Sequence, residues 1–137
     1  SVMRAFEPQH IQLPSPQVQA GASLRVVAFP LGFYDTTHHL PVVRHAIVAS
    51  SFGVRFEGHG YFLTDGRMHR GTSGAPVLLR CEAGDGEIPW RLLGIHSAGL
   101  DMSGRDAAQD ESLGLNCTWY ADILMTLTKP SASALIC

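Results

Sequence analysis

Short runs of apolar and β-branched residues, separated by clusters of glycine, proline and polar residues, make up most of this 137-residue chain. Such runs are typical of buried β-strands, because strands in compact domains are short and turn residues connect them. The polar segment AGDGEIP at 83–89 carries the strongest turn signal and predicts a hairpin. The pattern predicts strands at residues 24–29, 42–52, 61–65, 76–82, 90–98 and 113–120.

The hydrophobic period changes near the end of the chain. In ADILMTLTK the apolar residues Ile123, Leu124 and Leu127 recur at helical spacing and Pro130 follows, which predicts one short C-terminal helix. The polar segments at 30–41 and 101–112 are expected to be loops. Six short strands with a single terminal helix indicate an all-β fold, a small antiparallel barrel rather than a sheet of βαβ units.

The two ends of the chain differ from this pattern. Residues 1–21 contain three of the eight prolines and show no clean period, which predicts an irregular entry in which Ile11 and Leu13 form a short edge strand. Residues 22–130 are expected to hold the barrel and the helix, and 131–137 a tail. A hydrophobic content of 45% is enough for one core in a chain of this length.

Charge and cysteine content narrow the partners and the compartment. Ten Lys and Arg residues against twelve Asp and Glu residues give a net charge of -2, which disfavours nucleic acid and anionic membranes as partners. No apolar run is long enough for a membrane helix, and no signal-peptide pattern is present. The three cysteines, Cys81, Cys117 and Cys137, have neither disulfide nor zinc spacing and favour a reducing, cytoplasmic compartment.

The stretch GTSGAPVLL at 71–79 holds the strongest candidate for chemistry. A serine hydroxyl becomes an effective nucleophile when a tight turn exposes it, a base takes its proton and N–H groups face the oxyanion that forms. Gly71 and Gly74 permit such a turn around Ser73, and Pro76 can begin the next strand. The alternative is an ordinary surface turn, because glycine, serine and proline are common in turns.

Two linked blocks favour the catalytic interpretation. LTDGRMHRGTSGAPVLL followed by RLLGIHSAG resembles the trypsin-like serine peptidases, and VVAFPLGF at 26–33 is similar to an upstream strand and turn of that family. The resemblance is greatest to bacterial HtrA-like proteases and glutamyl endopeptidases, because RGTSG is similar to their RGNSG and Asp65 precedes Ser73 by eight residues. It extends from Leu24 to the terminal helix and implies a Greek-key barrel, the C-terminal half of a two-barrel fold of bacterial type.

This resemblance assigns roles to individual residues. It implies that Ser73 is the nucleophile and that the amides of Gly71 and Ser73 form the oxyanion hole. His96 would lie in the pocket for the substrate side chain on the acyl side of the cleaved bond, the S1 pocket, where an imidazole can bind Glu or Gln. A histidine satisfied by its neighbours inside a strand is the alternative. The following residues, Ser97, Ala98 and Gly99, would line the substrate groove and pair with the peptide backbone.

Residues close to the serine turn have plainer interpretations. Asp65 is expected to form a turn or to accept hydrogen bonds from nearby backbone N–H groups, and it stands two residues too far from Ser73 for a trypsin-type counter-charge. His69 and Arg70 either brace the turn or contact solvent.

The base is missing from this stretch of sequence. In the family order a histidine and an aspartate precede the serine by roughly 140 and 90 residues, whereas 72 residues precede Ser73 here. The resemblance therefore places both on an N-terminal barrel upstream of Ser1. A local base at His38 or His39, oriented by Asp35, is disfavoured, as is a metal site at the same pair. The histidines that show no base motif of the family are His10, His38, His39, His45, His59 and His69.

We therefore expect a serine endopeptidase that needs no cofactor or metal and acts on extended peptide segments. The isolated chain is expected to be a poor catalyst, because a serine without its base keeps little of the acceleration. A catalytically silent module that binds peptides or proteins in the same groove is the alternative. A structural barrel within a larger assembly is a third possibility and predicts an empty groove.

Overall fold

A computed structural model describes residues 4–100, 102 and 104–130, so the expected tail at 131–137 lies outside the described residues. Its strands are β1 (Ser23–Ala28), β2 (Val42–Val48), β3 (Tyr61–Asp65), β4 (Pro76–Arg80), β5 (Trp90–Gly99) and β6 (Leu115–Tyr120). Its α-helices are α1 (Ala107–Leu113) and α2 (Ile123–Leu127). The 3₁₀ turns are η1 (Pro8–His10), η2 (Pro30–Gly32) and η3 (Phe56–Gly58).

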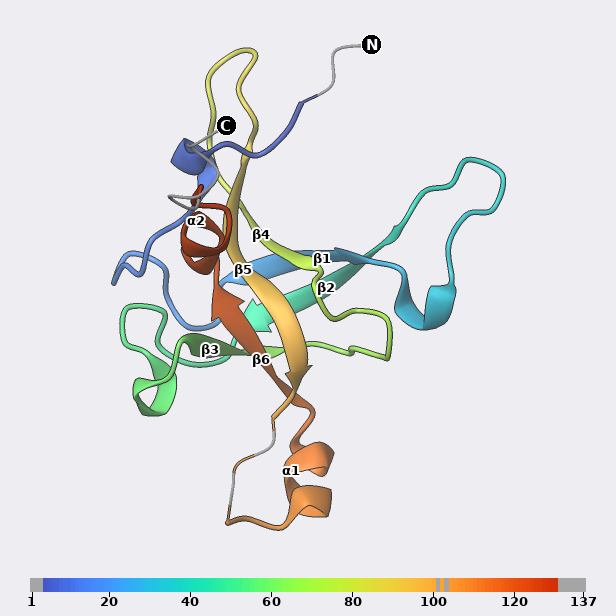
Figure 1. The fold of residues 1–137 in the computed structure, drawn as a ribbon, viewed down its shortest axis with the longest axis vertical. Helices are drawn as coiled ribbons and strands as arrows, with labels where there is room; N and C mark the ends of the chain where they lie inside the picture. Colours follow the sequence, from blue (N-terminus) through green and yellow to red (C-terminus); the bar gives the residue numbers. More distant parts are fainter. Residues whose placement is uncertain (1–3, 101, 103, 131–137) are drawn as a thin grey trace.

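The six strands close into an antiparallel barrel in the order β1-β2-β3-β6-β5-β4 (Figure 1). Strand β4 follows β3 in the chain but pairs with β1, on the edge of β1 opposite β2. The long connection from β3 to β4 gives the barrel its Greek-key topology. The connection, at 66–75, contains the serine turn. The predicted all-β barrel with a short C-terminal helix is confirmed.

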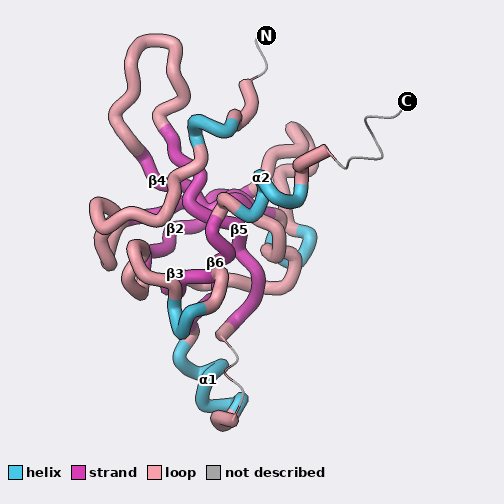
Figure 2. The backbone as a smooth tube through the Cα atoms, turned by 60° about the vertical axis from the view of Figure 1, so that its left-hand side comes forward, coloured by secondary structure: helices cyan, strands magenta, loops and turns pink. Residues whose placement is uncertain are grey.

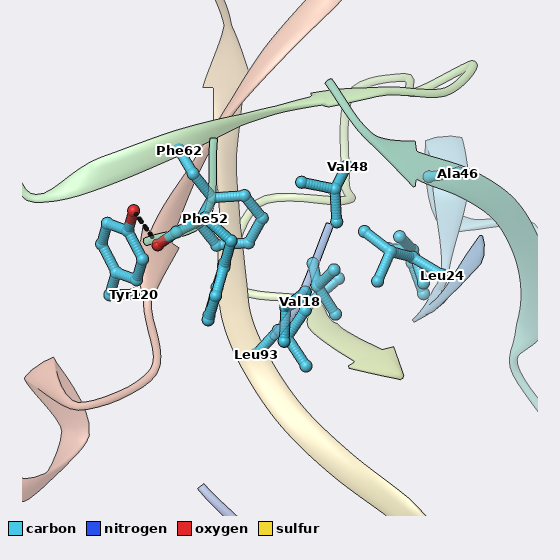
Figure 3. Close-up of a cluster of buried hydrophobic side chains, with 12 residues drawn as sticks. Val18, Leu24, Ala46, Val48, Phe52, Phe62, Leu93 and Tyr120 are labelled. Carbon is cyan, nitrogen blue, oxygen red and sulfur yellow. Dashed lines mark hydrogen bonds between the residues drawn. The ribbon is translucent and has the colours of Figure 1, made fainter. Parts of the chain in front are cut away.

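Alternation along the strands places one set of side chains inside the barrel. In β1, for example, Leu24, Val26 and Ala28 are buried, whereas Ser23 is exposed and Arg25 and Val27 are half-buried. Buried aromatic rings fill one end of the interior, where Phe52 meets Phe62 edge-on with ring centroids 5.0 Å apart. The remaining space is packed by aliphatic residues, among them Val18, Leu24, Val48 and Leu93 (Figure 3).

A buried tyrosine ties a loop to this core. The hydroxyl of Tyr120 donates to the carbonyl of Phe52 at 2.8 Å, which satisfies the only polar group on the ring (Figure 3). Phe52 itself was expected at the end of a strand over 42–52. The strand β2 stops at Val48 instead, and Phe52 reaches the core from the loop that follows.

The entry segment and α2 cover part of the outer surface of the barrel. Ile11 forms an isolated parallel bridge with Leu92, so the expected edge strand is reduced to one bridge, and Leu13 is exposed. Ile11 and Leu124 of α2 pack against a second apolar cluster formed by Leu78, Leu92 and Ala121. No helix within the described residues is long and apolar enough to cross a membrane.

The prediction of a loop at 101–112 was wrong at 107–112, because α1 covers these residues and ends at Leu113, where the last strand was expected to begin. Asp106 caps this helix by accepting a hydrogen bond from the N–H of Ala108, and Gly114 ends it with a left-handed φ of 68°. The buried carboxylate of Asp110 binds Arg105 Nε at 2.7 Å and the N–H of Met102 at 3.1 Å. A helix too short to be stable alone is thus fixed by its cap and an ion pair, at the opposite end of the molecule from α2 (Figure 2).

Candidate active site

Local hydrogen bonds hold the serine turn in one conformation. Gly71 and Gly74 have left-handed φ values of 88° and 85°, as the sequence predicted for this turn. Between them the side chain of Thr72 is buried, and its hydroxyl donates to the carbonyl of His69. The N–H of Ala75 donates to the carbonyl of Thr72 at 3.0 Å and closes the turn before β4 begins at Pro76.

The turn is joined to β5 at the position of His96. The N–H of Gly74 donates to the carbonyl of His96 at 2.8 Å, and the N–H of His96 donates to the carbonyl of Ala75 at 2.9 Å. This reciprocal pair places the exposed side chain of Ser73 beside β5, where its Oγ donates to the carbonyl of Ser97 at 2.5 Å. The structure therefore brings together Ser73, His96 and Ser97, which the sequence assigned to one site.

Two backbone N–H groups beside Ser73 are oriented and free. A trans peptide directs its C=O and its N–H to opposite sides. The carbonyl of Arg70 accepts from the N–H of Leu31 at 2.7 Å, so the N–H of Gly71 points away from that contact. The Thr72 carbonyl is likewise fixed by Ala75, which orients the N–H of Ser73. Within the described residues neither N–H has a protein acceptor, so both can donate to an oxyanion.

The contact with the loop after β1 explains why position 71 is glycine. A Cβ there would lie 2.8 Å from the carbonyl oxygen of Phe29 and 3.2 Å from the nitrogen of Leu31. Leu31 also adopts a left-handed φ of 53°, which is unfavourable for a leucine. The segment PLG at 30–32 therefore serves as a support for the serine turn, a role that sequence analysis missed.

A pocket of about 610 Å³ opens beside Ser73. His96 and the residues after it, Ser97, Ala98 and Gly99, form one side, and residues 65–70 form another. The buried amide of Asn116 donates to the carbonyl of Gly66 at 2.9 Å and joins β6 to this second side. Sequence analysis gave Asp65, His69 and Arg70 other roles, although all three line the pocket. The other lining residues that it did not assign to the pocket are Gly66, Arg67, Met68, Thr72, Glu111, Gly114, Leu115 and Asn116.

His96 lies in this pocket with an unsatisfied polar atom. Its side chain is 3% exposed, and its Nδ1 is buried without a hydrogen-bond partner among the described residues. Burial lowers the pKa of His96 from its ordinary value of 6.5, so the imidazole is neutral at pH 7. The alternative of a histidine satisfied by its neighbours does not describe Nδ1, because a buried polar atom normally has a partner.

Charged residues of both signs line the pocket. Arg67 and Arg70 lie on the same segment as Asp65, and Glu111 of α1 also lines the pocket. Asp65 ends β3 with an exposed side chain, and its carboxylate accepts none of the expected hydrogen bonds from backbone N–H groups of the described residues. His69 and Arg70 brace the turn through their carbonyls rather than through their side chains.

One edge of β5 beside Ser73 is free to accept a peptide. On this side β4 pairs with β5 only up to the register Pro76↔Ile95, and the contacts of His96 with the turn follow. Ala98 and Gly99 pair with β6 on the other side. Within the described residues no strand pairs with 98–99 on the side of the turn, so an extended segment can add there by β-type hydrogen bonding.

No imidazole is hydrogen-bonded to Ser73 in the described part of the chain. Asp35 does bind His38 Nδ1 at 2.8 Å, and this contact is the chief cause of the lowered pKa of Asp35. Asp35 forms an isolated bridge with Leu40, so the pair lies in the loop between β1 and β2. This loop extends away from the barrel (Figure 1). Asp35 therefore does orient His38, but neither residue lines the pocket beside Ser73.

Neither a scan against protein-family models nor a search of curated proteins finds a match for this chain. Function must therefore be argued from the residues and their geometry. Among the described residues no group of three or more His, Cys, Asp or Glu side chains is arranged to hold a metal ion.

Proposed function

We propose that this chain is the nucleophile-bearing C-terminal barrel of a trypsin-like serine endopeptidase, of the HtrA-like or glutamyl-endopeptidase-like type. The observation that carries the proposal is the serine turn, in which the exposed hydroxyl of Ser73 lies beside two free N–H groups and a pocket. The free edge of β5 next to that hydroxyl supports a peptide as the substrate rather than a small ester.

The chemistry follows from this arrangement. Ser73 Oγ attacks the peptide carbonyl carbon, its proton passes to a base, and the oxyanion accepts hydrogen bonds from the N–H groups of Gly71 and Ser73. The base returns the proton to the leaving amine, and water then hydrolyses the acyl-enzyme. In the proposal an N-terminal barrel of the same protein supplies the base histidine and its aspartate, and it completes the cleft between the two barrels.

His96 gives the proposal a preferred substrate side chain. A neutral imidazole that lines the pocket can exchange a hydrogen bond with a Glu or Gln side chain. Arg67 and Arg70 favour an acidic side chain, although Asp65 and Glu111 offset part of their charge. We therefore propose cleavage after Glu or Gln.

One contact favours the alternative of a silent peptide-binding module. The hydroxyl of Ser73 is engaged by the carbonyl of Ser97, an acceptor that cannot take its proton. Unless a base displaces this contact, the groove can hold a peptide without cleaving it.

Peptide hydrolysis separates the two proposals. The longest natural polypeptide that contains this chain is incubated with fluorogenic peptides that differ only in Glu, Gln, Leu or Lys before the cleaved bond. We expect turnover of the Glu and Gln peptides that is lost in Ser73→Ala. If the long polypeptide and its Ser73→Ala variant bind the peptides with equal affinity and neither cleaves them, the chain is a binding module.

A further inference from the structure

A second groove lies on the outer surface of the barrel, apart from the pocket beside Ser73. Its volume is about 650 Å³, and none of its lining residues belongs to the pocket beside Ser73. Successive side chains of a strand point to opposite faces of the sheet. Because the buried residues of β1 point into the barrel, Arg25 and Val27 between them point outward and line the groove. Apart from Ser23, the groove is lined by Arg25, Val27, Val43, Leu78, Arg80 and Trp90.

Strand pairing sets these side chains next to one another. Arg25 stands opposite Leu78 across β1 and β4, and Arg80 stands opposite Trp90 across β4 and β5. Val27 is opposite Val43, whose side chain is 60% exposed although it is apolar. The groove thus has an apolar floor with a guanidinium in each of two cross-strand pairs.

Both guanidiniums are held in place without a carboxylate partner. Arg80 lies over the ring of Trp90 at 5.7 Å, and Arg25 Nη1 donates to the carbonyl of Leu24 at 3.0 Å. Neither forms an ion pair with a carboxylate of the described residues. A guanidinium stacked on a ring keeps the N–H groups of its edge available, and that edge matches a carboxylate.

We propose that this groove, the Arg25–Arg80 groove, binds a peptide segment that carries acidic side chains next to apolar ones. Charge complementarity favours carboxylates, because the two guanidiniums make the groove locally positive although the chain has a net charge of -2. The exposed Val43 and the ring of Trp90 provide apolar surface for the neighbouring side chains. Because the barrel is closed here, recognition runs through side chains rather than through addition of a strand.

Tryptophan fluorescence tests this proposal without any need for catalysis. The chain has two tryptophans, so Trp119→Phe leaves Trp90 as the only one. This variant of the full chain is titrated with the peptide acetyl-Glu-Phe-Glu-Leu-amide and with the same peptide carrying Gln in place of Glu. We expect a saturable change in Trp90 emission with the Glu peptide, weaker at high salt, and none with the Gln peptide.

Arginine variants locate the binding. Arg25→Gln and Arg80→Gln are each expected to weaken binding of the Glu peptide about tenfold, the loss of one charged hydrogen-bond partner. Arg67→Gln is the matched control, because it removes one charge from the pocket beside Ser73, and it should leave the Trp90 titration unchanged. If Trp119→Phe fails to fold, isothermal titration calorimetry on the unsubstituted chain and its Arg80→Gln variant measures the same difference.

Several results would overturn the proposal. They are an absence of saturation with the Glu peptide, an equal response to the Gln peptide, or equal binding by the chain and the two groove variants. Emission of Trp90 that changes with protein concentration alone would show that a second copy of the chain covers the groove, and it too would overturn the proposal.

Discussion

At the scale of single residues, the candidate site depends on where backbone groups point. The hydroxyl of Ser73 and the N–H groups of Gly71 and Ser73 come from one turn, and each is oriented by a neighbour that is not itself reactive. Ala75, Leu31 and Ser97 supply those contacts. A substitution that keeps Ser73 but moves one of these neighbours is therefore expected to damage the site.

Gly71→Ala tests the support of the turn. An alanine at position 71 must adopt a left-handed φ and place its Cβ 2.8 Å from the Phe29 carbonyl oxygen. Gly74→Ala is the matched control, because Gly74 has a similar φ but no atom within 4 Å of a Cβ. In urea denaturation we expect losses of about 2–4 kcal/mol for Gly71→Ala and about 1–2 kcal/mol for Gly74→Ala. Equal losses of unfolding free energy in the two variants would argue against support of the turn by Phe29 and Leu31.

His96 predicts a pH dependence of stability. Its pKa is lowered from 6.5 by burial in the folded chain, so the unfolded chain binds more protons between 6.5 and the folded pKa. The contribution of His96 is complete above pH 6.5 and is lost as the pH falls through that window. We expect the free energy of unfolding to fall more between about pH 7 and about pH 5 in the natural chain than in His96→Gln. The same fall in both chains would contradict the burial of His96.

At the scale of elements, one wall of the pocket beside Ser73 belongs to the α1 segment, which is held by its own contacts rather than by the strands of the barrel. Helix α1 and the residues around it are tied by the contacts of the buried Asp110 with Arg105 and Met102. Glu111 and Gly114, at the end of this segment, line the pocket. The geometry of the pocket therefore depends on an ion pair that lies outside it.

Asp110→Ala is expected to release this segment while the barrel stays folded. Without the carboxylate, Arg105 and the Met102 amide lose their partner, and the helix has too few turns to persist alone. Hydrogen exchange followed by mass spectrometry should show faster exchange at 104–114 and unchanged exchange in β1 and β2. Glu111→Ala removes the same charge from an exposed neighbour and should leave exchange unchanged. Slow exchange at 104–114 in Asp110→Ala would refute the anchoring role.

The elements that sequence predicted well are those with a clear period or turn signal. All six strands were expected because their apolar runs are bounded by glycine, proline or polar residues, and α2 because its apolar residues have helical spacing. Helix α1 was missed because its sequence AAQDESL lacks an apolar face and gains its stability from a buried ion pair. An aspartate cap followed by two alanines was the signal that could have found it.

The site was predictable in part for a related reason. The position of Ser73 between glycines follows from local turn chemistry, which a sequence displays directly. The support from Phe29 and Leu31 and the pocket wall at 111–116 involve residues far apart in the chain, so no local pattern revealed them. The roles of Ser73 and His96 in catalysis and in substrate choice stay predictions.

At the scale of the whole molecule, one core holds the strands that carry the site. Leu93 is fully buried in β5, three residues before His96, and packs in the main cluster. Leu93→Ala is expected to lower the free energy of unfolding by about 2–5 kcal/mol in urea denaturation, because it leaves a cavity. Leu127→Ala, at a side chain that is 71% exposed, should change it by less than about 0.5 kcal/mol. Equal effects would contradict the packing.

In the proposed function, this barrel is one half of an active cleft. It holds the proposed nucleophile, the proposed oxyanion donors and the proposed substrate edge, while no imidazole of the described residues is hydrogen-bonded to Ser73. The central claim is therefore that Ser73 becomes reactive when an N-terminal barrel of the same protein brings the base.

Intact-mass analysis after treatment with a fluorophosphonate tests this claim most directly, because only an activated serine forms the adduct. The reagent is applied to this chain, to the longest natural polypeptide that contains it, and to the Ser73→Ala variant of each. We predict one adduct on the long polypeptide, none on its Ser73→Ala variant and little on the isolated chain. An unlabelled long polypeptide would contradict the peptidase, and full labelling of the isolated chain at Ser73 would contradict an upstream base.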